Sequence, residues 1–170
     1  MIRSPHLRRL QGFTLLEVLV YLAILIIVST AAVSLIISLD NVIDRYRVDT
    51  ALYRSGTNVM EQVVVELRRG DDFDVANSVL NNTASGTLAI MNGATTTVIS
   101  KVGDELILTV NGEVYGNLLQ ESVTVTGFTV YKYDTASGTL VRVKLDLSVT
   151  IESVTKTITL YGAAIIRGEI

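Results

Sequence analysis

The chain of 170 residues contains no cysteine and no tryptophan, and only one histidine and one proline. Without cysteine it forms neither a disulfide framework nor a thiolate metal site, so its stability must come from packing. The histidine is His6 and the proline is Pro5, and both lie within the first twelve residues. The sequence also lacks a Gly-x-Ser-x-Gly elbow and a phosphate-binding glycine loop. We therefore expect neither an enzyme nor a cofactor.

Basic residues are few and unevenly placed. The chain has 14 Lys and Arg against 17 Asp and Glu, for a net charge of −3. Arg3, Arg8 and Arg9 lie in residues 1–12, which contain no acid, so removal of that segment would leave a side-chain charge of −6. Binding to nucleic acid depends on a basic stripe, and none is present outside residues 1–12. Nucleic acid is therefore not an expected partner.

A long apolar run follows the three arginines. From Val18 to Leu39 there are 22 consecutive residues without a charge, enough for a helix to cross a hydrocarbon core of ~30 Å. Arginines precede the run and Asp40 and Asp44 follow it, which places residues 1–12 in the cytoplasm and the rest outside. A secretory signal has small residues after its apolar core, whereas here the small residue, Gly12, comes before it. A cut at Gly12 would leave the apolar helix on the mature protein.

One carboxylate, Glu17, lies near the start of this apolar segment, in Gly12-Phe13-Thr14-Leu15-Leu16-Glu17. A charge in a membrane-spanning segment is costly and usually functional. The stretch resembles the leader and N-terminal helix of type IV prepilins and type II secretion pseudopilins. The resemblance implies cleavage between Gly12 and Phe13 by a prepilin peptidase and N-methylation of Phe13. It also implies residence in membrane lipid, then assembly with other pilin or pseudopilin subunits by an ATPase and an assembly platform protein.

The resemblance also implies a role for Glu17, which is to pair with the N-terminal amine of a neighbouring subunit. At about 4 Å and an effective dielectric of ~20, such a pair gains on the order of 4 kcal/mol. The alternative is a carboxylate that reaches the cytoplasmic interface of a plain membrane anchor. Many pilins have a helix-breaking proline where this chain has Ser34, so the resemblance does not imply local melting of the helix here. The hydroxyls of Ser29, Thr30 and Ser34 could still loosen the helix through hydrogen bonds to backbone carbonyls.

Helical periodicity continues beyond Leu39. Two apolar sets recur at helical spacing: Val42, Ile43, Tyr46 and Tyr53, then Val59, Met60, Val63, Val64 and Leu67. The pattern leaves open a bend or a break at residues 56–58. Arg68, Arg69 and Gly70 predict a C-terminal cap, and Asp44–Arg47 and Glu66–Arg69 predict i, i+3 pairs on an exposed face.

The remainder predicts β-structure. Residues 141–151 alternate apolar and polar, and Asn92-Gly93 and Asn111-Gly112 indicate hairpin turns. The expected strands are Thr87–Met91, Thr96–Val102, Glu105–Val110, Val123–Tyr133, Val141–Ile151 and Val154–Arg167. No helix separates them, so the sheet should be mainly antiparallel. The predicted fold is α+β and pilin-like, with a leader (1–12), a transmembrane or fibre-core helix (13–39), an amphipathic helix (40–70) and a β-rich head (71–170).

Two short patterns have both a functional and a structural interpretation. Arg69-Gly70-Asp71 spells an integrin-binding tripeptide, but a helix cap explains its first two residues. Asp71, Asp72 and Asp74 resemble part of a calcium loop without the full ligand set, and a solvated acidic turn is the favoured interpretation.

The predicted function is that of a filament subunit, with the leader cytoplasmic and the head outside until assembly into an extracellular pilus or an envelope pseudopilus. Phe128–Tyr131 and Ile165–Arg167 resemble the minor pilins called PilW and their type II secretion relatives called GspJ. The alternative is a bitopic membrane protein that keeps residues 1–12 and presents its β-domain as an adhesin or sensor.

Overall fold

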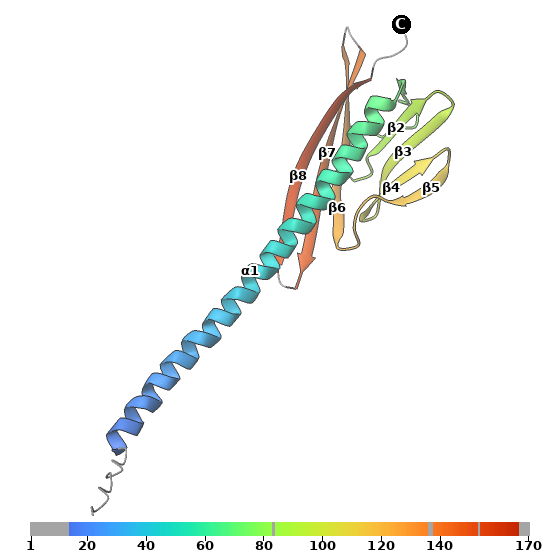
Figure 1. Cartoon of the computed structure of the whole chain (residues 1–170). Helices are drawn as coiled ribbons and strands as arrows, with labels where there is room; N and C mark the ends of the chain where they lie inside the picture. The colour runs from blue at the N-terminus through green and yellow to red at the C-terminus, as the bar shows by residue number, and fades with distance from the viewer. Residues whose placement is uncertain (1–13, 83, 136–137, 153, 167–170) are drawn as a thin grey trace, which may run out of the picture. The chain divides into compact units, whose positions relative to one another are not determined.

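The computed structural model describes residues 14–82, 84–135, 138–152 and 154–166 (Figure 1). The chain divides into two compact units, with residues up to Ile43 in the first and residues from Asp44 in the second. One long helix and two antiparallel sheets make up the described residues, which confirms the predicted α+β class.

Helix α1 extends without interruption from Leu15 to Arg69. Its last turn carries Arg68 and Arg69, and the N–H of Gly70 bonds to the carbonyl of Glu66 at 3.1 Å, which ends the helix at the predicted cap. The predicted salt bridges Asp44–Arg47 and Glu66–Arg69 both form, at 3.8 and 3.5 Å. Both are i, i+3 pairs between an exposed arginine and a half-buried acid, and such surface pairs contribute little to stability.

The possible break at residues 56–58 does not occur. Gly56 is a buried helical residue because the sheet passes close to it: a Cβ there would lie 2.5 Å from Leu160 Cδ1 and 3.0 Å from Leu147 Cδ1. Glycine is destabilising in a helix interior by about 1 kcal/mol relative to alanine. Here it permits close approach of helix and strand rather than a turn.

The buried face of α1 differs in part from the predicted one. Val59, Val63 and Leu67 are buried as expected, but the buried residues that precede them are Val48, Leu52, Ser55 and Gly56. The predicted Val42, Ile43, Tyr46 and Tyr53 are exposed. They recur at helical spacing on a different face, so periodicity located an apolar stripe without indicating which side the sheets cover.

The first sheet has five antiparallel strands in chain order (Figure 1). They are β1 (Asp72–Phe73), β2 (Thr87–Asn92), β3 (Thr95–Val102), β4 (Glu105–Val110) and β5 (Glu113–Asn117). Asn111 and Gly112 have φ of 52° and 84° between Val110 and Glu113, as a two-residue type I′ hairpin requires. The sequence pattern did not predict β1, which has two residues, or β5, whose residues are almost all exposed.

The second sheet has three long antiparallel strands, β6 (Val123–Thr135), β7 (Gly138–Ile151) and β8 (Val154–Ile166). The predicted alternation in β7 is confirmed: Val141, Val143, Leu145, Leu147 and Val149 are all buried. β8 ends at Ile166, and Arg167, the predicted end of this strand, lies outside the described residues.

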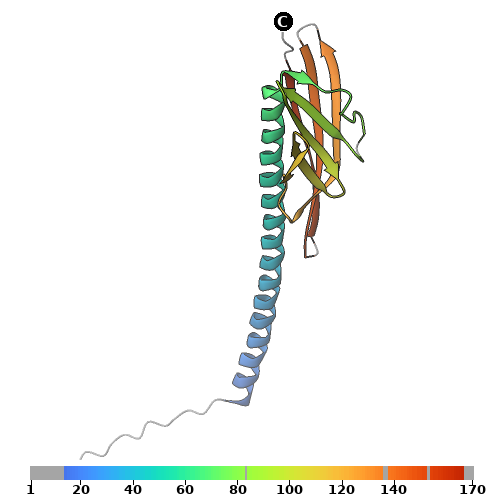
Figure 2. The same ribbon diagram turned by 90° about the vertical axis from the view of Figure 1, so that its right-hand side faces the viewer.

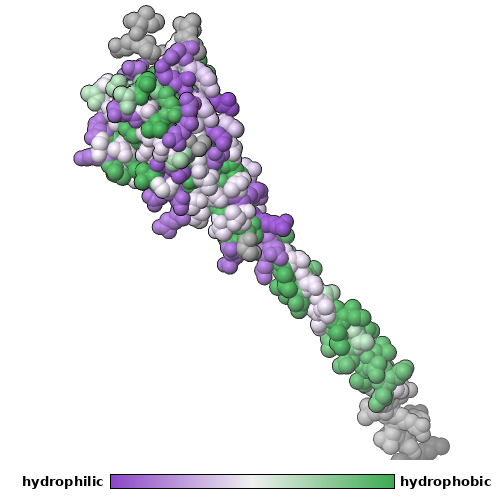
Figure 3. Space-filling view, turned by 180° about the vertical axis from the view of Figure 1, so that it is seen from behind, coloured by the Kyte–Doolittle hydropathy of each residue, from purple (hydrophilic) through white to green (hydrophobic). Residues whose placement is uncertain are grey.

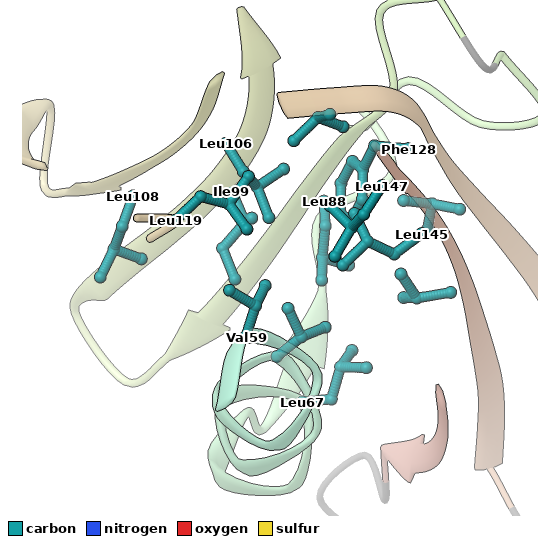
Figure 4. Close-up of a cluster of buried hydrophobic side chains, with 14 of the residues drawn as sticks. Val59, Leu67, Leu88, Ile99, Leu106, Leu108, Leu119, Phe128, Leu145 and Leu147 are labelled. Atoms are coloured by element: carbon teal, nitrogen blue, oxygen red, sulfur yellow. The ribbon is translucent and has the colours of Figure 1, made fainter. Parts of the chain in front are cut away.

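The core lies where the second part of α1 and the two sheets meet. Figure 4 shows Val59 and Leu67 of α1, Leu88, Ile99 and Leu106 of the first sheet, and Phe128, Leu145 and Leu147 of the second directed into one interior. Phe128 is fully buried, which stabilises the fold by about 1.5–3 kcal/mol relative to an exposed ring. Figure 2 shows the helix running alongside both sheets in this part of the chain.

Candidate functional site

The candidate site is the apolar part of α1 from Leu15 to Leu39. Every residue in this segment is exposed, including all its leucines, isoleucines and valines. α1 is long and apolar enough to cross a membrane, and its most apolar window is wholly exposed. The same segment forms a green and white surface in Figure 3, in contrast to the mixed surface of the head. An apolar surface of this extent requires lipid or other apolar helices around it.

Glu17 lies on this surface, in the first turn of α1, and its side chain is exposed. It is the only charged residue between Thr14 and Leu39. A carboxylate in the first turn interacts favourably with the helix dipole, and this interaction is worth about 0.3–1 kcal/mol. That is much less than the cost of burying an unpaired charge, so an ionised Glu17 requires a cation if the surface becomes buried.

Thr14 fixes the start of the helix. Its carbonyl accepts hydrogen bonds from the N–H groups of Glu17 and Val18 at 3.0 and 3.2 Å, and its Oγ1 lies 3.3 Å from the N of Glu17. Thr14 is therefore the N-cap and Glu17 the N3 residue. This role was not among the predictions, although Thr-x-x-Glu before an apolar run is the pattern of a capping box.

Polar side chains farther along the apolar segment bond within the helix. Thr30 Oγ1 donates to the carbonyl of Ile26 at 2.8 Å, and Ser34 Oγ donates to the carbonyl of Thr30 at 3.0 Å. Two of the three hydroxyls that were expected to bond to carbonyls, those of Thr30 and Ser34, thus do so, and the helix continues through both bonds. They satisfy the hydroxyls inside an apolar surface, where an unpaired polar group is costly.

The predicted cleavage and methylation residues, Gly12 and Phe13, lie outside the described residues. Phe13 immediately precedes the Thr14 cap in the sequence. Phe13 and Glu17 are four residues apart, close to the 3.6 residues of one helical turn. Cleavage at Gly12 and pairing through Glu17 both remain predictions.

The two short patterns of the head have structural roles. Gly70 is buried, and a Cβ there would lie 2.2 Å from Ile90 Cγ2, while Asp71 Oδ2 accepts a bond from the N–H of Gly93 at 2.9 Å. Asp74 accepts bonds from the backbone and side chain of Asn77, and the side-chain bond is the main cause of its lowered pKa. Arg69-Gly70-Asp71 thus ends a helix and begins a sheet. Within the described residues, no group of three or more acids and histidines is arranged to hold a metal ion.

The comparisons with known proteins support the interpretation of the N-terminal segment. The family model that matches is described as the prokaryotic N-terminal methylation motif, and it covers residues 7–33. The chain carries a type IV pilin-like N-terminus. The match includes Gly12, Phe13, Thr14 and Glu17 and ends within the apolar part of α1. No curated protein and no solved structure matches the chain.

The motif at residues 7–33 supports a type IV pilin-like substrate of a prepilin peptidase, and the long apolar helix is consistent with a membrane anchor. The match does not extend to the sheets, so the role of the head has to be inferred from its own residues.

Proposed function

We propose that the chain is a structural subunit, a minor pilin or pseudopilin, of a type IV pilus or type II secretion-like filament. A prepilin peptidase cuts between Gly12 and Phe13, and Phe13 is then N-methylated. An assembly platform protein transfers the apolar part of α1 from membrane lipid into the filament core. The observation that carries the proposal is Glu17, the one charge on an exposed apolar surface from Leu15 to Leu39.

The energetics favour a paired Glu17 over a solitary one. In a filament core the new amine of one subunit is a cation that can meet Glu17 of the next. Their attraction at about 4 Å is on the order of 4 kcal/mol at an effective dielectric of ~20. Either charge alone would lose several kcal/mol of solvation. The ion pair between the amine and Glu17 therefore selects one axial offset between neighbouring helices, whereas the apolar contacts alone are compatible with many offsets.

The rival function is a bitopic adhesin or sensor that keeps residues 1–12 and never enters a filament. In that protein Glu17 faces the cytoplasmic interface and needs no subunit partner. The loss of its charge would then leave the distribution of the protein between cell fractions unchanged.

The test compares wild type with Glu17→Gln and Glu17→Val by the amount of protein in sheared filaments and in membranes. We expect cleavage to proceed in all three and the filament fraction to fall at least about ten-fold in both variants, since they remove the charge. Glu61→Gln, which alters an exposed acid on the head part of α1, is the matched control and should assemble normally. Normal incorporation of Glu17→Val would contradict the pairing.

A further inference from the structure

The side of the second sheet that faces away from the core carries an unusual set of side chains. The register aligns Tyr133 with Leu140 and Ile165 across the three strands, and Tyr131 with Arg142 and Ala163. The next row on this side pairs Lys144 with Tyr161. Residues two apart in a strand share a face, and the intervening Val141, Val143 and Leu145 are buried in the core. We call the outward set the tyrosine face: Tyr131, Tyr133, Leu140, Arg142, Tyr161 and Ile165.

Most of the tyrosine face is exposed even though most of its residues are large and apolar or aromatic, and only Tyr131 and Leu140 are half-buried. Tyr133, Tyr161 and Ile165 are 48%, 56% and 51% exposed, and Arg142 is also exposed. The register alone places side chains of all three strands on this side. A cluster of exposed aromatic side chains around a cation is typical of a binding surface.

Arg142 is the free cation of this surface. Its guanidinium carbon lies 4.7 Å from the centre of the Tyr161 ring, which holds the group by a cation–π contact. Within the described part of the chain it forms no ion pair, whereas Lys144 is paired with Asp146 at 2.8 Å and Lys132 with Asp134 at 2.7 Å. A held guanidinium can bind a carboxylate through two parallel hydrogen bonds.

The size of the tyrosine face limits what it binds. Three strands ~4.8 Å apart and rows ~7 Å apart give a surface of a few hundred Å², well below the ~800 Å² that each partner of a stable protein complex buries. Single-stranded nucleic acid needs a basic groove along several phosphates, whereas this face has one unpaired cation on an acidic protein. A short stretch of a sugar polymer with carboxylates matches the size, the single charge and the aromatic rings.

We propose that the tyrosine face binds an anionic polysaccharide, with Arg142 on a uronate carboxylate and the rings of Tyr131 and Tyr133 against the sugar faces. Tyr161 positions the guanidinium, and Leu140 and Ile165 extend the apolar surface. The surface lies on β6, β7 and β8 and uses no part of the apolar helix, so this inference does not depend on filament assembly.

The test uses the detergent-solubilised full chain and immobilised polygalacturonate, with neutral dextran and single-stranded DNA as comparison probes. Wild type should bind polygalacturonate and neither of the others. Arg142→Gln should weaken binding about ten-fold or more, because a hydrogen bond to a charged group is lost. Arg142→Lys should bind more weakly than wild type and more tightly than Arg142→Gln, and Tyr133→Ala should weaken binding with unfolding unchanged.

The matched controls are Tyr53→Ala and Arg54→Gln, which alter an exposed tyrosine and an exposed arginine on α1 and should bind as wild type. Absence of binding by wild type would overturn the proposal, as would equal binding by Arg142→Gln. If wild type bound dextran as tightly as polygalacturonate, the guanidinium would not be used, and if it bound DNA as tightly, a phosphate would suffice. Either result would also overturn the proposal.

Discussion

The hydroxyl of Thr14 accepts a hydrogen bond from the backbone N–H of Glu17, with 3.3 Å between Oγ1 and N. The first N–H groups of a helix have no partner within it, and in lipid no water replaces one. The hydroxyl of Thr14 therefore adds a second acceptor for this N–H, which also bonds to the carbonyl of Thr14 at 3.0 Å. The cap also fixes where the helix begins relative to Phe13, the residue that becomes the N-terminus if Gly12 is the cleavage site.

Replacing Thr14 by valine should weaken the first turn of α1. A lost cap costs about 1 kcal/mol, so the amide of Glu17 should exchange with solvent about five-fold faster in detergent micelles. Thr14→Ser keeps the hydroxyl and should exchange as wild type. Thr30→Val removes a hydroxyl that bonds to a carbonyl in mid-helix and should leave the Glu17 amide unchanged. Equal exchange in wild type and Thr14→Val would show that the cap is not formed.

Gly86 and Gly56 should respond differently to alanine. A Cβ on Gly86 would lie 1.8 Å from the carbonyl oxygen of Phe128, a backbone atom that cannot move without shifting β6. We expect Gly86→Ala to destabilise the protein by about 1–3 kcal/mol. At Gly56 the nearest atom is the tip of Leu160, and the gain of about 1 kcal/mol in helix propensity offsets the displacement. The measurement is the urea midpoint, and equal midpoints of the two variants would contradict this account.

The ion pair between Lys156 of β8 and Asp49 of α1 should make stability depend on alkaline pH. The hydrogen bond to Asp49 raises the pKa of Lys156 above its ordinary value of 10.5. Because the folded state binds this proton more tightly, the stabilisation is complete below that value and is lost as the pH rises through the raised pKa. Both side chains are substantially exposed, so the effect is small.

Lys156→Arg separates this pair from other groups that titrate at high pH. Arginine stays protonated, so urea midpoints from about pH 8 to about pH 12 should fall less steeply for the variant than for wild type. Lys156→Met removes the ion pair, so this variant should be less stable than wild type only at pH values below the pKa of Lys156. Parallel decline of wild type and Lys156→Arg would show that the pair does not contribute.

Local patterns in the sequence sufficed to predict much of the head. β7 was predicted from the strict alternation of apolar and polar residues. The turn at Asn111-Gly112 was predicted because asparagine and glycine adopt the positive φ that a two-residue hairpin turn requires. The buried side of α1 followed for Val59, Val63 and Leu67 but not before them, because Tyr46 and Tyr53 are apolar enough to suggest a core, whereas Ser55 and Gly56 are not. Small residues are buried there because Leu160 and Leu147 approach closely, and this approach is a tertiary relationship that the helix sequence does not contain.

The candidate site was predictable to a different degree in each of its parts. Glu17 was evident because a single charge interrupts an apolar run. The Thr14 cap was present as a local pattern, and recognising it required only the spacing to Glu17. The tyrosine face was not predictable, since Tyr131, Arg142 and Tyr161 lie on three strands and come together only through the register of β6, β7 and β8.

The most direct test of the central claim is the intact mass of the protein isolated from sheared filaments and from membranes. We expect the filament species to begin at Phe13 and to carry one additional methyl group. A small amount in filaments relative to other subunits would identify a minor subunit, and a large amount a major one. A full-length, unmethylated species confined to membranes would contradict the account and favour the bitopic adhesin or sensor.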